Sequence, residues 1–452
     1  MKYFFIGIAG AGMSAVAQYL KGKGSSISGS DRLFMTSNGD SIKQKLENLD
    51  IKCYPQGSAV IDKDTDFVVV STAIEDTVPE YEFAKENSIK VIHRSDLLAQ
   101  ICDENFTIAV SGTSGKSTVT AMIFDILSKC QKEPSLITGA GLISLQNKGL
   151  IGNAYVGKSN ILVIEVDESD GTIVKYSPQI GLILNIDKDH KEISELIPLF
   201  ETFKSHVKKQ LIVNLDNKLS RQLGGGGSDF SCLDSSAENY AENFSQSISG
   251  IVFYSDNQEF TLNLLGKHNM ENALAAISVA RIFNISDKEI SKALSTYEGI
   301  YRRGRIIYNN DGVLVIDDFA HNPAKISAAV SSAQAIGERV LAWFQPHGFK
   351  PSKLMKDELI EKLSKLLRKD DVMIFSKIFY AGGTADKTIS AQEFALGLTQ
   401  NGKNSLYIQE REDLLEYLKE NVRKGDVVLL MGARDTSLGD FAEEVKNAVA
   451  NR

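Results

Sequence analysis

Seven consecutive residues have the types and order of a loop that binds phosphate: Gly112, Thr113, Ser114, Gly115, Lys116, Ser117 and Thr118. They follow an apolar run that predicts a strand and precede one that predicts a helix. Backbone amides of such a loop surround a phosphate, Lys116 would bridge the outer phosphates, and the Ser117 hydroxyl would bind Mg²⁺. The loop departs from the full P-loop pattern, whose first glycine would fall at Val110. A turn without a ligand is the alternative, and the position between strand and helix disfavours it.

A carboxylate and an imidazole follow the next two predicted strands. Glu165 ends the strand in NILVIEVD, and His190 comes just past GLILNID. Strands of an open parallel sheet point their carboxyl ends at the ligand crevice, so both side chains can reach the phosphates. We therefore predict a magnesium site formed by Ser117, Glu165 and His190. For Glu165 or His190 alone, a solvated strand end or a loop residue is the favoured interpretation, but their joint position after a phosphate loop favours the metal.

A second glycine loop, GIAGAG, lies between the first predicted strand and helix and includes Gly10, Ala11 and Gly12. Glycines there let the backbone approach a pyrophosphate, which the helix amides and dipole also favour. Asp31 ends the second strand, where a carboxylate can bond a ribose hydroxyl. The pattern does not separate NAD from other nucleotide diphosphates, and a tight turn without a ligand remains open.

Two further motifs lie later in the chain. Asn269 and Asn272 are three residues apart at a predicted helix start and can bond an adenine edge, although helix capping explains them equally well. Arg302 and Arg303 can clamp a phosphate, or be only solvated surface residues. The segment DDFAHNP after the next strand offers two more candidates, Asp318 for a ribose and His321 beside a reacting group.

The elements that must position these residues alternate between strand and helix. This pattern predicts an α/β protein with three domains, each built on a mostly parallel sheet. We place a Rossmann-like domain at 1–104, a central P-loop-like domain at 105–300 and a second Rossmann-like domain at 301–452. The sequence becomes polar around 215–250, and its run Gly224 to Gly227 is expected to be a flexible surface loop within the domain.

Composition excludes several classes of protein. The 452 residues suggest about three domains. With 58 acidic and 50 basic residues the net charge is −8, so we expect no nucleic acid or anionic membrane as partner. Four cysteines without a CxxC pair make disulfides or structural zinc improbable and fit the cytoplasm. Glycines interrupt the apolar N-terminus, which argues against a secretory signal, and no apolar run is long enough to span a membrane.

In this order the motifs resemble the Mur ligase family, which builds the peptide of bacterial cell-wall precursors by ATP-dependent amide formation. The resemblance rests on GTSGKST, EVDESD followed by DH, GKHNMENALAA, RRG and DDFAHNP, and covers essentially the whole chain. The segments GIAGAGMS, SGSD, VVVSTAI, HRSDLLA and FQPH are most similar to members that join L-alanine to UDP-N-acetylmuramate. The resemblance implies that the protein uses ATP and two Mg²⁺ ions. It also implies that the protein binds only small-molecule substrates and is a monomer or a homodimer.

The resemblance also implies roles for the candidate residues. Lys116, Glu165, His190 and His321 would be catalytic, and Asn269, Asn272, Arg302, Arg303 and Asp318 would join the phosphate loop in binding ATP. The C-terminal domain would close over ATP and the amino acid. The UDP-sugar would be bound by residues of the N-terminal domain: Gly10, Ala11, Gly12, Met13, Ser14, Asp31, Ser71 and Thr72. Many members carry a carbamylated lysine after the DH segment; Phe203 holds that position here, as expected for the alanine-adding branch.

Three segments depart from the family pattern: DHKE, DDFAHNP and FQPHGFKPSK. In the last, Gly348 stands where a substrate-anchoring arginine usually follows FQPH, and Lys350 or Lys353 could replace it. The amino acid added is therefore open, and a ligase that attaches a recycled tripeptide is the nearest rival. An NAD-dependent oxidoreductase leaves GTSGKST, Glu165 and His190 unexplained. The intact site disfavours a non-catalytic scaffold, and the N-terminal domain disfavours a folate or poly-amino-acid substrate.

Overall fold

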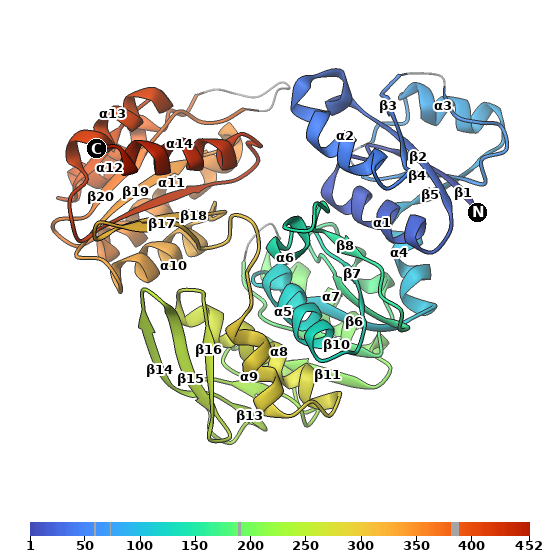
Figure 1. Cartoon of the computed structure of the whole chain (residues 1–452), viewed down its shortest axis with the longest axis horizontal. Helices are drawn as coiled ribbons and strands as arrows, with labels where there is room; N and C mark the ends of the chain where they lie inside the picture. Colours follow the sequence, from blue (N-terminus) through green and yellow to red (C-terminus); the bar gives the residue numbers. More distant parts are fainter. Residues whose placement is uncertain (58–59, 73, 189–190, 381–387) are drawn as a thin grey trace. The chain divides into compact units, whose positions relative to one another are not determined.

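The protein is described here by a computed structural model that covers residues 1–57, 60–72, 74–188, 191–380 and 388–452 (Figure 1). The predicted metal ligand His190 lies outside these residues. By packing, the chain forms two units. The first comprises 1–243, 253–262 and 270–300, and the second comprises 244–252, 263–269 and 301–452.

The N-terminal sheet has five parallel strands in the order β3-β2-β1-β4-β5. The short apolar runs that predicted buried strands form its centre, because both of its faces are covered. Its strands are β1 (Lys2–Ile6), β2 (Ser26–Asp31), β3 (Lys52–Pro55), β4 (Phe67–Val70) and β5 (Lys90–His93). Its helices are α1 (Ala11–Gly22), α2 (Asp40–Glu47), α3 (Pro79–Glu86) and α4 (Arg94–Asp103), with short 3₁₀ turns η1 (Arg32–Met35) and η2 (Ser37–Gly39).

The central sheet has the order β11-β10-β6-β9-β7-β8 and is parallel except for β8. Its strands are β6 (Phe106–Ser111), β7 (Ser135–Ile137), β8 (Ala154–Tyr155), β9 (Ile161–Glu165), β10 (Ile180–Ile183) and β11 (Gln210–Val213). The helical elements are α5 (Lys116–Lys129), α6 (Ile143–Gln146), η3 (Thr172–Lys175), α7 (Ile193–His206), η4 (Ser220–Leu223), α8 (Lys267–Ile282) and α9 (Asp287–Ser295).

The polar segment 215–250 combines loops with short strands. The glycine run lies in one of these loops, and Asp229 fixes it by accepting the amides of Val213 at 2.9 Å and Gly225 at 2.7 Å. Around it are β12 (Phe230–Ser231) paired with β13 (Asn239–Tyr240), and a three-stranded sheet of β14 (Glu242–Ser247), β15 (Gly250–Ser255) and β16 (Gln258–Leu262). The glycine run is a loop, and its expected flexibility stays a prediction. The short strands around it were not predicted, since short polar strands lack an apolar periodicity.

The C-terminal sheet has the order β17-β18-β22-β19-β20-β21. Its strands are β17 (Arg305–Asn310), β18 (Val313–Asp318), β19 (Arg339–Gln345), β20 (Val372–Phe375), β21 (Ser405–Tyr407) and β22 (Asp426–Gly432). All pairs are parallel except β17 with β18, an antiparallel edge that the sequence did not predict. The helices are α10 (Pro323–Gln334), α11 (Phe349–Leu366), α12 (Gln392–Gln400), α13 (Arg411–Asn421) and α14 (Leu438–Ala450). Three mostly parallel sheets confirm the predicted fold class.

One hydrophobic core joins the N-terminal and central sheets within the first unit. It runs from Phe5 and Val16 in the N-terminal domain to Leu162 and Phe203 in the central domain. Helix α1 packs against β7 and β8, as Figure 1 also shows. The C-terminal sheet has a separate core on each face. The N-terminal and central domains therefore share one apolar core, whereas helices of the C-terminal domain cover both faces of the C-terminal sheet.

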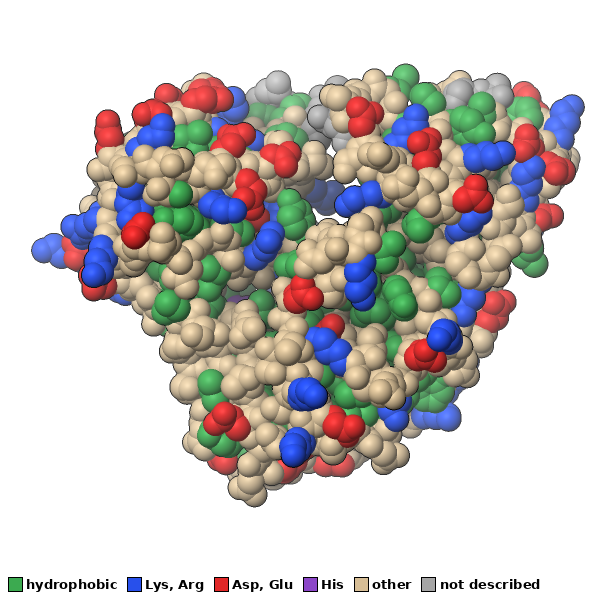
Figure 2. Space-filling view, in the orientation of Figure 1, with side chains coloured by type: hydrophobic (Ala, Val, Ile, Leu, Met, Phe, Trp, Pro, Cys, Tyr) green, Lys and Arg blue, Asp and Glu red, His purple; other side chains and the backbone are tan. Residues whose placement is uncertain are grey.

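The surface agrees with the modest net charge. On the face shown in Figure 2, acidic and basic side chains are interspersed. Among the described residues, no helix combines the length and the apolar character that crossing a membrane requires.

Phe203 tests the importance of the shared core. Its ring is fully buried on α7. We expect Phe203→Ala to lower the free energy of unfolding of the first unit by about 3–5 kcal/mol, because it removes buried apolar surface and leaves a cavity. Urea unfolding measures the change. The exposed neighbouring variant Glu201→Ala is the control, and an equal, small effect of both substitutions would contradict the assignment of Phe203 to the core.

Candidate functional site

The predicted phosphate loop links β6 to α5 and adopts a conformation that needs glycine. Gly112 has φ 133° and Gly115 has φ 85°, both in the region that side chains disfavour. Gly115 is the N-cap of α5, so the first amides of that helix face the loop. The dipole of α5 adds partial positive charge at this point. Loop and helix together form the setting in which anions bind.

Asn185, just after β10, holds the loop in this shape. Its Oδ1 accepts the Thr113 hydroxyl and the Ser114 amide, both at 2.8 Å, and its Nδ2 donates to the Ser114 carbonyl at 3.1 Å. Asn272 lies against the other end of the loop, where a Cβ on Gly115 would come within 2.6 Å of its Oδ1. Asn185 therefore fixes the loop through hydrogen bonds, and Asn272 packs closely against Gly115.

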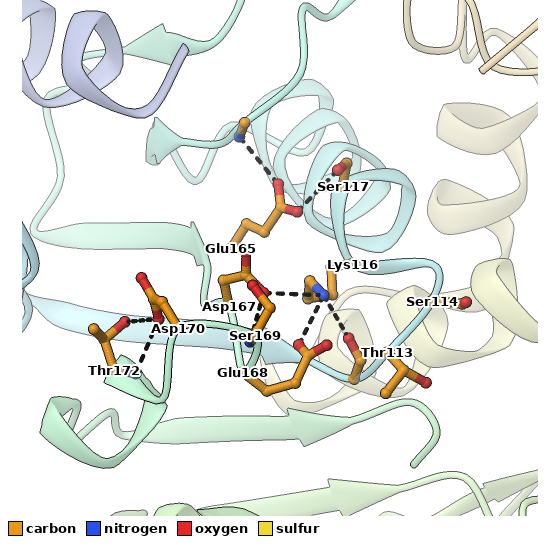
Figure 3. Close-up of polar contacts among 12 residues, drawn as sticks. Thr113, Ser114, Lys116, Ser117, Glu165, Asp167, Glu168, Ser169, Asp170 and Thr172 are labelled. Carbon is orange, nitrogen blue, oxygen red and sulfur yellow. Dashed lines mark hydrogen bonds and ion pairs between the residues drawn. The ribbon is translucent and has the colours of Figure 1, made fainter. Parts of the chain in front are cut away.

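Lys116 points back over its own loop, as Figure 3 shows. Its Nζ donates to the Gly112 carbonyl at 2.7 Å and to Glu168 at 2.8 Å, with Asp167 at 3.7 Å. Burial lowers the pKa of Lys116, but the nearby carboxylates Glu168, Asp167 and Glu165 outweigh this effect and hold the pKa above its ordinary value. The ammonium group therefore stays charged at the mouth of the phosphate loop.

Glu165 is fixed on both of its carboxylate oxygens. Its Oε1 accepts the Ser117 hydroxyl at 3.0 Å, and its Oε2 accepts the Thr138 hydroxyl at 2.9 Å and the Gly139 amide at 3.0 Å. The structure thus brings together Lys116, Ser117 and Glu165 as the sequence predicted (Figure 3). Glu165 is placed there by β6 and β9, which pair with Val110 opposite Glu165.

The donors at this point fit Mg²⁺. Ser117 and Glu165 offer hard oxygen ligands, and Mg²⁺ commonly binds one or two carboxylates together with substrate phosphates and water. Among the described residues, no three His, Cys, Asp or Glu side chains form a metal-binding group. The predicted ligand His190 lies outside the described residues.

The N-terminal glycine loop precedes α1, with Gly10 as its N-cap. Gly10 and Ala11 are exposed and Gly12 is half-buried, whereas Met13 and Ser14 are buried. Asp31 accepts the amides of Ala9 and Leu33, each at 2.9 Å, so its carboxylate fixes the loop backbone. Ser71 and Thr72 follow β4 at the same carboxyl edge of this sheet.

The C-terminal domain gathers the arginine pair and DDFAHNP at the carboxyl end of β18. Arg302 is buried, with its Nε 3.1 Å from both oxygens of Asp317 and its Nη2 donating to the Gly432 carbonyl at 3.1 Å. Burial raises the pKa of Asp317 to about 6, although Arg302 opposes the shift. Arg303 lies over the Phe319 ring, 4.9 Å from its centroid. Arg302 therefore has a carboxylate partner within its own domain.

His321 lies beside a second imidazole, and Asp318 caps the turn before it. The rings of His321 and His347 are 5.7 Å apart. Burial lowers the pKa of His321 to about 4, and the positive charge of Lys325 adds to the effect. Asp318 accepts the Ala320 amide at 2.7 Å. Asn269 is buried at the start of α8 and donates to the Leu265 carbonyl at 2.7 Å.

Sequence reasoning missed three residues that hold the site: Thr138, Glu168 and Asn185. Glu168 lies within EVDESD, but its contact with Lys116 was not predicted. Thr138 stands in a segment without a recognisable pattern, and Asn185 lies near the end of the predicted strand GLILNID without a role of its own. Their position after a predicted strand, or beside a glycine, was the only signal available.

Comparison with known proteins agrees with this geometry. Three segments match Mur ligase models: the "Mur ligase family, catalytic domain" at 2–105, the "Mur ligase middle domain" at 110–280 and the "Mur ligase, glutamate ligase domain" at 302–434. The UDP-N-acetylmuramate–L-alanine ligase of Pelotomaculum thermopropionicum is 32% identical, covering 95% of this chain and 94% of the relative. That of Geobacter sp. strain M21 is also 32% identical, covering 96% and 94%.

Solved structures show the same architecture. The UDP-N-acetylmuramate–alanine ligase of Thermotoga maritima superposes with a TM-score of 0.78 at 25% identity, covering 100% of this chain and 99% of the other. A murein peptide ligase from Psychrobacter arcticus has the same fold, with a TM-score of 0.66 at 19% identity and coverage of 100% and 99%. Family matches along the chain and relatives aligned over nearly all of it show that this protein belongs to the Mur ligase family.

Proposed function

We propose that this ligase joins L-alanine to the lactyl carboxylate of UDP-N-acetylmuramate, with ATP as energy source and Mg²⁺ as cofactor, in peptidoglycan precursor synthesis. The observation that carries the proposal is the cluster of Lys116, Ser117 and Glu165 at the phosphate loop. An oxidoreductase has no use for this cluster, and a scaffold would not need it. The names of the relatives that align over nearly their whole length support the choice of UDP-N-acetylmuramate and L-alanine as substrates. The reaction is placed in the cytoplasm, where ATP and the UDP-sugar are available.

The reaction must bring two anions together. The lactyl carboxylate attacks the γ-phosphorus of ATP, forming an acyl phosphate and releasing ADP. The amino group of L-alanine then attacks the acyl carbon, and inorganic phosphate leaves. Lys116 supplies positive charge to the outer phosphates, and the amides of α5 supply further donors. When bound, Mg²⁺ would neutralise phosphate charge and orient the phosphate oxygens. The proposed ligands of the two Mg²⁺ ions are Ser117, Glu165 and His190.

The remaining candidates bind substrate groups in this proposal. Asn269, Asn272 and Asp318 hold the nucleoside of ATP. Arg303 is the more accessible of the arginine pair and contacts phosphate, while Arg302 stabilises the strand ends through Asp317. The UDP-sugar binds at the N-terminal carboxyl edge, through the exposed loop Gly10 to Gly12 and through Asp31, Ser71 and Thr72.

The start of α11 bears on the choice of amino acid. Gly348 is its N-cap at φ 69°, and a Cβ there would lie 3.2 Å from Pro351. The family's arginine would therefore be strained at this position. Lys350 and Lys353 are exposed in the first two turns of α11 and are the proposed substitutes. If neither anchors alanine, a recycled tripeptide is the alternative acceptor.

The substrate test is phosphate release from ATP and Mg²⁺ in the presence of UDP-N-acetylmuramate, with single amino acids added in turn. We expect release that requires both the nucleotide sugar and L-alanine, because the acyl phosphate forms on the sugar and is discharged by the amine. Release only with another amino acid or a tripeptide would reassign the acceptor. No release with any acceptor would refute the proposed reaction.

Lys116→Ala tests the phosphate loop. We expect a loss of turnover of at least about 100-fold, because the charge on the outer phosphates is removed. Stopped-time ADP assays measure it, and Lys158→Ala is the control, since the Lys158 side chain is 85% exposed. Lys116→Ala also leaves the buried Glu168 unpaired, so Lys116→Ala/Glu168→Gln is the second variant if the first unfolds. Near-normal turnover in either folded variant would refute the role of Lys116.

His321 predicts a pH dependence of stability. Its folded pKa of about 4 lies below the ordinary histidine value of about 6.5. The unfolded chain therefore binds more protons in this window, and stability is lost as the pH falls from 6.5 towards 4. His321→Gln should make the unfolding free energy fall less between pH 7 and pH 5, by about 2 kcal/mol. Urea midpoints at both pH values measure this, and identical slopes would contradict the burial of a neutral imidazole.

A further inference from the structure

Asn153 lies just before β8, at the contact between the central sheet and α1. It is 3% exposed, and all its carboxamide groups are used. Its Nδ2 donates to the Ala11 carbonyl at 2.7 Å and to the Ser14 hydroxyl at 2.9 Å. Its Oδ1 accepts a hydrogen bond from the side-chain Nε2 of Gln18 at 2.8 Å. The side chain of Asn153, in the central domain, therefore forms hydrogen bonds with the start of α1, the helix that follows the N-terminal glycine loop.

The backbone of the same residue leads to the phosphate loop. The Asn153 carbonyl accepts the Thr138 amide at 3.0 Å. The Thr138 hydroxyl then donates to Glu165 Oε2 at 2.9 Å, and Glu165 Oε1 accepts from Ser117 at 3.0 Å. A continuous series of hydrogen bonds thus runs from the N-terminal glycine loop to the phosphate loop, and every bond lies within the first unit.

Adhesion between the two domains does not require this polar contact. The shared hydrophobic core already joins them, and an exposed ion pair between Lys208 and Asp103 at 2.9 Å crosses the same boundary. A buried carboxamide is costly unless its partners stand at the right distance and angle. Such a group adds little net stability but disfavours every other relative position of the elements that it joins.

We propose that Asn153 is a positioning residue that sets the N-terminal glycine loop relative to Glu165 and Ser117. The inference rests on the proposed function, in which these two loops hold the nucleotide sugar and ATP. Attack on the γ-phosphorus needs the carboxylate within about 3–3.5 Å, and a misplacement of about 1 Å can cost 100-fold in rate. Each substrate can still bind its own loop when the relative position of the loops is lost.

The test compares Asn153→Ala and Asn153→Asp with Lys208→Ala, a control that crosses the same boundary without reaching either loop. Asn153→Asp keeps the size of the side chain but loses both donors. Turnover is measured per folded molecule, and the Kd of UDP-N-acetylmuramate and of Mn²⁺ with a non-hydrolysable ATP analogue are measured separately. We expect kcat to fall by about 100-fold in both Asn153 variants, with each Kd within about 5-fold of the unaltered protein.

Thr138→Val extends the test along the series of bonds. It removes the hydroxyl that orients Glu165 and leaves the Asn153 side chain in place. We expect it to weaken Mn²⁺ binding by about 10-fold or more, as loss of a group that orients a metal ligand does, without changing the Kd of the UDP-sugar. In the double variant Thr138→Val/Asn153→Ala, the fall in kcat should be smaller than the product of the two single-variant effects. Both substitutions disturb the same relative position of the two loops.

Several outcomes would overturn the inference. An unchanged kcat per folded molecule would mean that Asn153 only packs the domains, as would an Asn153→Asp variant with normal kcat. A loss confined to the Kd of one substrate would place Asn153 in that substrate's own site. If the unaltered protein does not use UDP-N-acetylmuramate, the proposed function fails, and amide exchange decides the inference. Asn153→Ala should raise exchange at both 10–14 and 138–139, and unchanged exchange at 138–139 would refute it.

Discussion

The site depends on the interaction between the ammonium group of Lys116 and the carboxylates at the carboxyl edge of the central sheet. Glu165 ends β9 at the carboxyl end of the central sheet, Asp167 and Glu168 follow it, and Lys116 lies among these three residues at the mouth of the loop. Three carboxylates against one lysine leave the edge acidic. A nucleoside triphosphate would be repelled here without additional positive charge, which the dipole of α5 and the proposed Mg²⁺ would supply. The pairing of β6 with β9 fixes this balance, because it sets Glu165 beside the loop.

Sequence reasoning succeeded where a signal is local. Apolar runs such as NILVIEVD and GLILNID identified interior strands of the central sheet, because parallel strands covered on both faces consist of such runs. The phosphate loop and Glu165 were placed together correctly, since the carboxyl ends of adjacent parallel strands must meet. The edge strand β17 was missed. Its polar ends, Asn309 and Asn310, lack the apolar character of the interior strands.

The remaining site residues could not be found from patterns, because their importance comes from partners distant in sequence. Asn185 matters only since it meets Thr113 and Ser114 across the sheet. Conversely, Asp31 and Arg302 were assigned to ligands from their residue types, their positions and the family resemblance. In the structure Asp31 binds backbone amides and Arg302 binds Asp317. A charged side chain at a strand end satisfies the general pattern whether it faces a ligand or holds the loop that does.

The polar contacts also explain how two glycine loops on different sheets can serve one reaction. Apolar packing joins the N-terminal and central domains, but it tolerates small shifts because it has no preferred direction. The hydrogen bonds of Asn153 and Thr138 have strict distances and angles, and they end at the two loops themselves. Hydrophobic burial therefore supplies the free energy of association, whereas a few buried polar groups determine the relative position at which association occurs. In a ligase that must align two anionic substrates, the second contribution is the one that turnover depends on.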